Sequence, residues 1–488
     1  MQTNLLVTLR GAGPLHARLY AELRAAVLDG RLAPGARLPA TRALAEELGV
    51  SRMVVVQAYE RLIAEGYLEA RVGSGTFVRA GLRVPLGAAA GAPGCAPERP
   101  PLRLSAWGAR ARAAGIGLVG AGGHRIDFRY GRPDPGAALL EAWRRAVRRA
   151  AARLEMGYGD PRGNERLRQA LAGYLARSRG VRADADRILV CTGSQQALDL
   201  AARVLLDPGD GAAIEEPHYQ GTRRVLEAAG ARLHPVATDD DGLLPASLPD
   251  DASVRLVVVT PSHQFPSGGV LPLARRLALL DWARARNAVV VEDDYDGEFR
   301  YDAEPVEAIQ ALDVDQRVLY VGTFSKVLFP GLRLGYLVVP PELADAFVRA
   351  KWLADRQSSP LEQEALAMLI EQGDFERHLR RCRQRYARRR EALLEAVARH
   401  VAGRVRVRVQ GAAAGLHVVL WFPELPAGRA ADLVAAAARR GVGVYPVAPY
   451  FLEPPDATGL VVGYAALTEA EIEEGVRRLA LALEETTT

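Results

Sequence analysis

From about residue 125 to the end, short apolar runs rich in β-branched residues alternate with amphipathic helical patterns. Runs that are apolar on both faces are typical of buried parallel strands with helices between them. The pattern therefore predicts an α/β domain with a mostly parallel sheet. The clearest runs are residues 187–190, 256–259, 288–291 and 318–321.

Two regions of different texture precede this domain. Residues 10–79 show a compact helical pattern that ends in a hairpin, and residues 80–124 are rich in Ala, Gly, Pro and Arg. The centre of the second region, residues 87–94, reads GAAAGAPG, which has little to bury and predicts a linker. We expect a short helix near Trp107, and two domains, 10–79 and 125–488, joined by residues 80–124.

Composition narrows the class of protein. No apolar run approaches the ~20 residues that cross a bilayer, and we expect no secretory signal at the N-terminus. The cysteines Cys95, Cys191 and Cys382 are odd in number and far apart. They predict neither a disulfide framework nor a metal site, and they fit a reducing cytoplasm. The formal net charge of +5 permits binding to polyanions without proving it.

The N-terminal region has the pattern of a helix-turn-helix. A second helix fits residues 41–48, with Thr41 as a candidate cap, and a third fits residues 52–65 after the short turn 49–51. Residues 68–78, LEARVGSGTFV, alternate around Gly-Ser-Gly and predict a hairpin, the wing of a winged helix. The first helix is predicted by one apolar face before Gly30, formed by Leu15, Leu19, Leu23 and Val27.

This region resembles the GntR family of winged-helix regulators in residues 38–45 (LPATRALA), 49–52 (GVSR) and 73–76 (GSGT). The resemblance implies that Arg42 and Arg52 contact phosphates or base edges of double-stranded DNA, that Ser51 caps the recognition helix, and that Gly75 and Thr76 approach the DNA backbone. The alternative is that both arginines are solvated surface charges. The turn and the wing around them favour DNA binding.

The recognition helix departs from the family. Met53 and Val54 replace a common Asn-Thr pair, and Val56 stands where an Arg is frequent. These changes remove polar groups, so they leave the operator sequence open more than DNA binding itself.

Lysine occurs only twice in the chain, as Lys326 and Lys351, although lysine and arginine together number 63. A guanidinium cannot form an imine, whereas a lysine amine can lose its proton and attack a carbonyl. Lys326 lies in GTFSKVLFPGLR, residues 322–333. The alternative is a residual surface charge, and rarity alone does not decide between the two.

Other segments supply what pyridoxal 5′-phosphate (PLP) requires. Residues 192–196 (TGSQQ) follow a predicted strand and open a helix, which suits a phosphate, although many strand-to-helix turns contain Gly-Ser. Ser325 and Arg333 are further candidate phosphate ligands, against a surface role for Arg333. Tyr219 could stack on a planar ring or simply pack.

The run 292–296 (EDDYD) ends another predicted strand, at the edge where ligands bind in open α/β sheets. A carboxylate at this edge would keep a pyridine nitrogen protonated, and Tyr295 could bind the phenolic oxygen. Acidic strand ends also bind metals or cap helices, so this segment alone is ambiguous.

The order of these segments resembles fold-type I aminotransferases over about residues 125–485, with a large PLP domain and a smaller C-terminal α+β subdomain. The resemblance implies that Lys326 forms the Schiff base, Asp293 pairs with the ring nitrogen, and Tyr295 meets the phenolic oxygen. Tyr158 is similar to a tyrosine that reaches the neighbouring subunit's phosphate. The remaining implied cofactor residues are Tyr219 for stacking and Ser194, Gln195, Ser325 and Arg333 for the phosphate.

A GntR-type winged helix, a linker and an aminotransferase-like domain together resemble the MocR subfamily of regulators. Residues 260–268 (TPSHQFPSG) and 292–296 are close to that subfamily's versions. The resemblance implies a head-to-tail homodimer that binds operator DNA and senses PLP, or an amino compound such as γ-aminobutyrate, through an aldimine at Lys326.

Two positions depart from working aminotransferases. Phe265 stands where an Asn often binds the cofactor, and residues 460–464 (LVVGY) lack the Arg that clamps an α-carboxylate. Both favour sensing over turnover. The alternatives are an active aminotransferase with a DNA-binding appendage, and a binding module whose lysine is inert.

Overall fold

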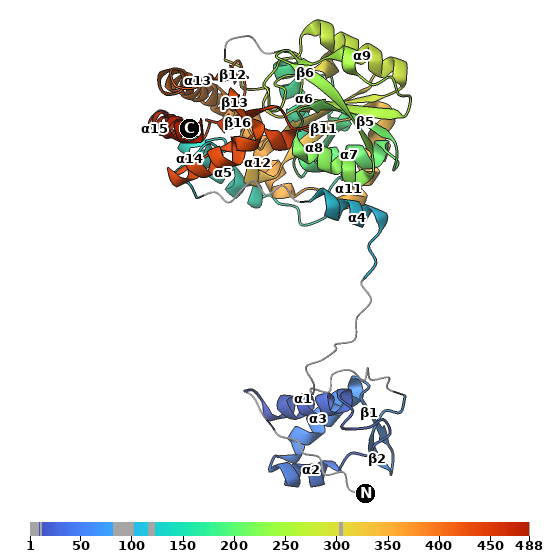
Figure 1. Cartoon of the computed structure of the whole chain (residues 1–488). Coiled ribbons are helices and arrows are strands. Elements are labelled where there is room, and N and C mark those ends of the chain that lie inside the picture. The colour runs from blue at the N-terminus through green and yellow to red at the C-terminus, as the bar shows by residue number, and fades with distance from the viewer. Residues whose placement is uncertain (1–8, 10–11, 82–101, 116–122, 302–305, 488) are drawn as a thin grey trace. The chain divides into compact units, whose positions relative to one another are not determined.

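A computed structural model describes residue 9 and residues 12–81, 102–115, 123–301 and 306–487. The chain forms two units, one within residues 1–102 and one within residues 103–488 (Figure 1). The centre of the expected linker, residues 87–94, and Cys95 lie outside the described residues. No helix in the described part of the chain combines the length and hydrophobicity that a bilayer crossing requires.

The small unit is a three-helix bundle with an antiparallel hairpin. Leu19, Leu23 and Val27 are buried on one face of the first helix as predicted, whereas Leu15 at its start is 41 % exposed. The hairpin pairs Leu68 with Val78 and Arg71 with Gly75, so the predicted wing is confirmed. The elements are α1 (Leu15–Leu28), α2 (Thr41–Leu48), α3 (Arg52–Ala64), β1 (Leu68–Arg71) and β2 (Gly75–Val78).

The large unit is built on an eight-stranded sheet in the order β4-β11-β10-β9-β8-β5-β6-β7. Its central strands β10, β9, β8, β5 and β6 run parallel, while β11 is antiparallel to both of its neighbours and β7 is antiparallel to β6. The strands are β4 (Ile188–Cys191), β5 (Gly211–Glu216), β6 (Arg232–Asp239), β7 (Gly242–Leu243), β8 (Val254–Val259), β9 (Val289–Asp294), β10 (Val318–Thr323) and β11 (Gly335–Val338).

Successive residues of the central strands enter different hydrophobic clusters. Val290 packs in a cluster with Leu279 of α9, and Val291 packs in another with Leu198 of α7. Side chains alternate between the faces of a strand, and helices cover both faces of this sheet, so both sets of side chains must be apolar. This is the physical reason that the apolar runs were continuous.

Helices follow most strands, as Figure 1 shows. Those of the large unit are α5 (Gly136–Ala151), α6 (Glu165–Arg179), α7 (Ser194–Leu205), α8 (Gln220–Ala229), α9 (Leu273–Arg286), α10 (Ile309–Leu312), α11 (Ala344–Asp355), α12 (Pro360–Glu371), α13 (Asp374–His400), α14 (Ala430–Arg439) and α15 (Glu469–Thr487).

A second, antiparallel sheet forms the C-terminal part, in the order β12-β13-β16-β15. Its strands are β12 (Arg408–Gln410), β13 (His417–Pro426), β15 (Tyr445–Pro446) and β16 (Ala457–Gly463), and a separate parallel pair joins β3 (Ile126–Asp127) to β14 (Val442–Gly443). A mostly parallel sheet with a smaller α+β part agrees with the predicted fold class.

Part of the expected linker is ordered against the large unit. Residues Ala106–Ala114 form α4, which confirms the predicted helix near Trp107. Arg110 Nε donates to Ala228 O at 3.0 Å, and a second nitrogen of Arg110 donates to Ala229 O at 3.3 Å. These carbonyls belong to the last turn of α8, where a cation is electrostatically favoured.

Candidate functional site

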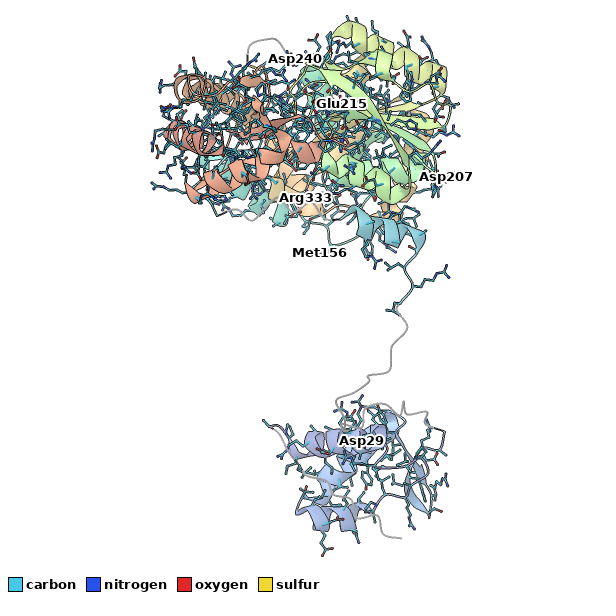
Figure 2. The ribbon with its side chains drawn as sticks, in the orientation of Figure 1. Asp29, Met156, Asp207, Glu215, Asp240 and Arg333 are labelled. Carbon is cyan, nitrogen blue, oxygen red and sulfur yellow. The ribbon has the colours of Figure 1, made fainter. Side chains whose placement is uncertain are left out.

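A cavity of about 140 Å³ opens at the carboxyl ends of the parallel strands. It collects eight of the nine residues expected to bind a cofactor, from segments spread between residues 194 and 333. They are Ser194, Gln195, Tyr219, Asp293, Tyr295, Ser325, Lys326 and Arg333. Arg333 is labelled in Figure 2, together with Glu215, which ends up buried near the same strand edge.

The start of α7 and the Arg333 side chain form one end of this cavity. Gly193 at the helix cap has φ 79°, and a Cβ there would lie 3.0 Å from a nitrogen of the Arg333 guanidinium. Arg333 itself has φ 53° and donates to Thr192 O at 3.1 Å. Free N–H groups of a helix start beside a guanidinium suit a phosphate.

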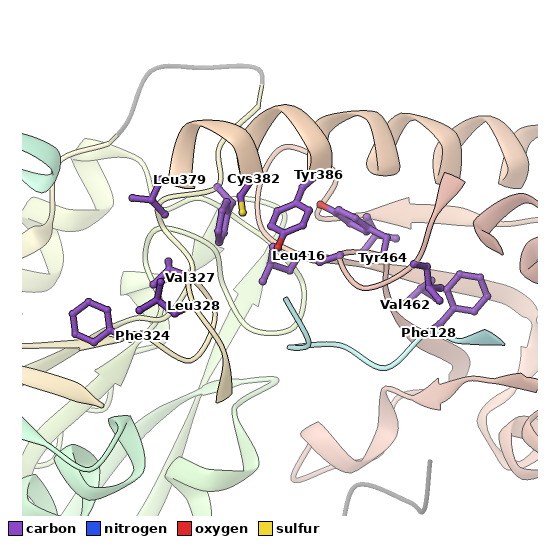
Figure 3. Close-up of a cluster of buried hydrophobic side chains, with 14 of the residues drawn as sticks. Phe128, Phe324, Val327, Leu328, Leu379, Cys382, Tyr386, Leu416, Val462 and Tyr464 are labelled. Carbon is purple, nitrogen blue, oxygen red and sulfur yellow. The ribbon is translucent and has the colours of Figure 1, made fainter. Parts of the chain in front are cut away.

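Lys326 is held on a buried segment. His378 of α13 donates from Nε2 to Val327 O at 2.7 Å, and Val327 and Leu328 pack beneath α13, near Leu379 and Cys382 (Figure 3). This packing holds the backbone next to the amine in place.

The Lys326 amine has a single hydrogen-bond partner in the described residues, Gly131 O at 3.4 Å. Burial lowers the pKa of Lys326, while Asp296 and Asp293 oppose that shift. A Cβ at residue 131 would stand 2.5 Å from Nζ, and Gly131 has φ 72°, so glycine is required where the backbone meets the amine. A neutral amine is the nucleophilic form.

Asp293 offers the strongest test of whether PLP fits the cavity. Its carboxylate is buried, and Oδ1 has no hydrogen-bond partner among the described residues. Burial raises the pKa of Asp293 to about 7, with Asp294 adding to the shift. A buried carboxylate without a partner suits a protonated pyridine nitrogen, so the residues fit this cofactor.

Aromatic rings form the remaining walls. Phe265 meets Tyr219 edge-on at a centroid distance of 5.7 Å, and Tyr295 in the same manner at 5.8 Å. Burial raises the pKa of Tyr219 to about 12. Both tyrosines therefore stay protonated at neutral pH, and each can donate a hydrogen bond into the cavity.

Tyr158 is the one expected cofactor residue outside the cavity. It is 80 % exposed, and the Arg356 guanidinium lies 4.7 Å from its ring centroid. Met156, labelled in Figure 2, is 93 % exposed in the same loop. Within one chain this loop does not reach the Lys326 cavity.

The structure adds residues that the sequence did not single out. His263 and Asp296 lay inside segments that had been noted as similar to the subfamily, so a signal existed for them. Tyr130, Gly131 and His417 come from segments without a motif and join the cavity only through the fold. His263, Asp296 and His417 lie close enough to consider a metal, but His417 Nε2 already donates to Pro266 O at 3.0 Å, and His263 is engaged by neighbours. We interpret His263 and Asp296, together with Tyr295, as a hydrogen-bonded group.

In the small unit, the starts of α2 and α3 meet. Arg52 Nε donates to Thr41 Oγ1 at 3.4 Å, and Arg42 and Arg52 are both exposed. Gly75 begins β2 with φ 111°, and a Cβ there would lie 3.1 Å from Nε of Arg37. Arg37 is therefore a further exposed cation beside the wing, and it was not predicted.

The predicted cap of α2 is wrong by one residue, whereas the predicted cap of α3 is confirmed in position. Ala40 occupies the cap position of α2, and Thr41 is the first helical residue, with its hydroxyl directed to Arg52. Ser51 does occupy the cap position of α3, but its side chain makes no capping hydrogen bond. Ser51 is exposed.

Comparison with known proteins agrees with both units. Residues 15–78 match the bacterial regulatory proteins of the gntR family, and residues 125–479 match the aminotransferase class I and II family. The chain is 40 % identical over 483 residues to the probable rhizopine catabolism regulatory protein MocR of Rhizobium meliloti, covering 96 % of this chain and 93 % of that protein.

It is 35 % identical to the HTH-type transcriptional regulator TauR of Rhodobacter capsulatus, covering 97 % of each chain. Among solved structures, the α-aminoadipate aminotransferase LysN of Thermus thermophilus, complexed with N-(5′-phosphopyridoxyl)-L-leucine, is 32 % identical with a TM-score of 0.68, covering 74 % of this chain and 92 % of that one. The cofactor of the large domain is PLP. The chain belongs to the MocR subfamily of GntR-type regulators, in which a winged helix precedes an aminotransferase-like domain.

Proposed function

We propose that this protein is a transcriptional regulator that binds operator DNA through its winged helix and senses PLP or an amino compound through Lys326. The observation that carries the proposal is the presence, in one chain, of exposed arginines at the starts of α2 and α3 and of a partly buried amine in a cavity. Operator binding also implies work in the cytoplasm.

In this proposal each cavity residue has one task. Lys326 holds the cofactor through its amine, Asp293 pairs with the ring nitrogen, and Tyr295 donates to the phenolic oxygen. Tyr219 stacks on the ring, and the phosphate is held by Ser194, Gln195, Ser325 and Arg333. When bound, PLP supplies an electrophilic carbon that reacts reversibly with amines.

The chain's own groups favour binding over turnover. Among the described residues that line the cavity, Arg333 is the only one with a guanidinium, and it belongs to the phosphate end. Residues 460–464 lie in or next to β16 and are buried without a charge. No second guanidinium among the described lining residues is therefore left to orient the carboxylate of an amino acid, and orientation supplies much of a catalytic rate.

The small unit supplies the DNA contacts. Arg42 and Arg52 would bind phosphates or guanine edges, with Ser51 between them, and Gly75 and Thr76 would approach the backbone at the wing. A shift between two arrangements of the protein, biased by the ligand in the cavity, would change the grip on DNA.

Assembly is part of the proposal. Tyr158 is exposed and remote from its own cavity, which suits a residue that reaches the phosphate of a second subunit. We therefore propose a head-to-tail homodimer in which each cofactor site is completed by the other chain.

The test maps genomic DNA bound by the full chain, with and without PLP. We expect a small set of operators whose occupancy changes with PLP.

Arg52→Ala should weaken DNA binding and reduce the slope of log K against log salt by about 0.9 if Arg52 contacts a phosphate. Unchanged binding in Arg42→Ala/Arg52→Ala would contradict the DNA assignment, and steady turnover of an amino donor with a keto acid would favour an enzyme.

A further inference from the structure

Two buried side chains, His263 and Asp296, and the half-buried Tyr295 form a hydrogen-bonded group at the cavity wall. His263 Nδ1 lies 2.8 Å from Tyr295 Oη and 3.1 Å from Asp296 Oδ2. The side chains of His263 and Asp296 are each 1 % exposed, so water does not compete for these bonds. A Cβ at Gly415 would stand 2.1 Å from the His263 ring, so the backbone of Gly415 packs directly against this ring.

The contacts of His263 determine which nitrogen carries the proton. Nδ1 faces a carboxylate oxygen, which accepts a hydrogen bond but repels a lone pair. Nε2 is buried and has no partner among the described residues. A buried N–H without an acceptor is rarer than an unsatisfied acceptor. Both observations place the proton on Nδ1.

This tautomer decides what Tyr295 can do. If Nδ1 carries the proton, Tyr295 Oη can only accept from it, and the tyrosine's own hydrogen is free to point into the cavity. If Nδ1 carried a lone pair instead, it would accept the hydroxyl hydrogen of Tyr295. Donation from Nδ1 also polarises the phenol and strengthens its O–H as a donor.

We propose that Asp296 is a positioning residue that keeps the His263 proton on Nδ1, so that Tyr295 reserves its hydroxyl hydrogen for the phenolic oxygen of the cofactor. The inference rests on the proposed binding of PLP. It matters in this chain because Phe265, on the same wall, has no polar group to share the task.

Other charged groups surround this network and remain unchanged in the test. Glu215 of β5 and Asp293 and Asp294 of β9 interact electrostatically with Tyr295. Asp294 and Lys326 interact electrostatically with Asp296. His417 of β13 faces His263, with ring centroids 5.1 Å apart. Tyr301 and Tyr464, on which Asp296 also acts electrostatically, both donate to Gly415 O.

The experiment follows the pH at which PLP bound to the full-length protein changes its visible absorbance. A hydrogen bond donated to an anionic oxygen favours the deprotonated form and lowers that midpoint. In Asp296→Leu, Nδ1 is free to become an acceptor and to capture the Tyr295 hydrogen. The midpoint should then rise by about one pH unit, towards that of Tyr295→Phe.

Two further variants separate this role from simple packing. Asp296→Asn removes the carboxylate charge that favours the protonated form at Lys326, but it keeps an oxygen that accepts from Nδ1, so its midpoint should not rise above that of the wild type. Asp296→Leu/His263→Leu removes the competing nitrogen, so the midpoint should return towards wild type. A packing defect would instead be larger in the double variant. The inference would be overturned if the midpoint of the double variant were as high as that of Asp296→Leu. It would also be overturned if the midpoint of Asp296→Leu equalled that of the wild type.

A direct measurement avoids any variant that fails to fold. In the full chain with ¹⁵N-labelled histidine, and with His263→Gln to assign the signal, His263 should show a protonated Nδ1 and an unprotonated Nε2. The opposite pattern overturns the inference. Wild-type protein that acquires no visible absorbance with PLP contradicts the proposed function instead, so the two failures are distinguishable.

Discussion

Lys326 and Lys351, the chain's two lysines, occupy opposite kinds of environment. The Lys351 side chain on α11 is fully buried, and its amine lies 2.6 Å and 2.7 Å from the two carboxylate oxygens of Asp355 and 3.0 Å from Ser358 Oγ. The Lys326 amine has one carbonyl at 3.4 Å, and no carboxylate in the described part of the chain lies within 4.0 Å of it.

The difference separates two uses of one residue type. The Lys351 amine has three hydrogen-bond acceptors, and Asp355 also binds Gln196 at 2.8 Å, which ties α11 to the start of α7. Lys326 is kept short of partners beside a cavity, and burial lowers its pKa. Equal scarcity in sequence therefore conceals one structural and one reactive amine.

The largest expected effect is on cofactor binding. Lys326→Ala should abolish the visible absorbance that bound PLP acquires, because no other amine lines the cavity among the described residues. Lys351→Met should retain that absorbance. Spectra of both variants titrated with PLP check this. An unchanged spectrum in Lys326→Ala would show that Lys326 is not the reactive amine.

The next largest effect is on stability, and here the Lys351 variant should be affected more than the Lys326 variant. Lys351→Met should lower the free energy of unfolding by about 1–3 kcal/mol, because it removes a buried hydrogen-bonded charge, while the partly exposed Asp355 keeps Gln196. Lys326→Met, the matched control, should change the stability of the cofactor-free protein by less than about 1 kcal/mol. Urea unfolding of both variants gives the two values, and equal losses would show that both amines are structural.

The smallest effect is a dependence on pH. Burial lowers the pKa of Lys326 in the folded protein below its usual 10.5. Between the lowered value and 10.5 the unfolded chain holds one more proton, so unfolding free energy rises with pH across that window. The advantage of cofactor-free Lys326→Met over wild type should therefore shrink as pH approaches 10.5. Unfolding at several pH values measures it, and a constant difference would mean that the pKa is not lowered.

The chain's local patterns predicted much of the fold and of the site. Continuous apolar runs gave the buried parallel strands, and the hairpin around Gly73–Gly75 gave the wing. Eight of the nine predicted cofactor residues line one cavity, because strands of one parallel sheet deliver their carboxyl ends to the same edge. The helix caps were predicted less well: Thr41 is one residue inside α2, and Ser51 makes no capping hydrogen bond. A capping side chain can choose among several partners, and the sequence does not say which.

What the sequence determined by itself was the order of domains, the strand and helix periods, and the local segment around Lys326. Only the tertiary structure decided that the Lys351 amine binds Asp355 and Ser358. It also decided that Gly131 and His417 line the cavity, and that His263 contacts both Tyr295 and Asp296. Periodicity and turn chemistry act over a few neighbouring residues. Burial, hydrogen-bond partners and pKa depend on groups that folding brings together from distant parts of the chain.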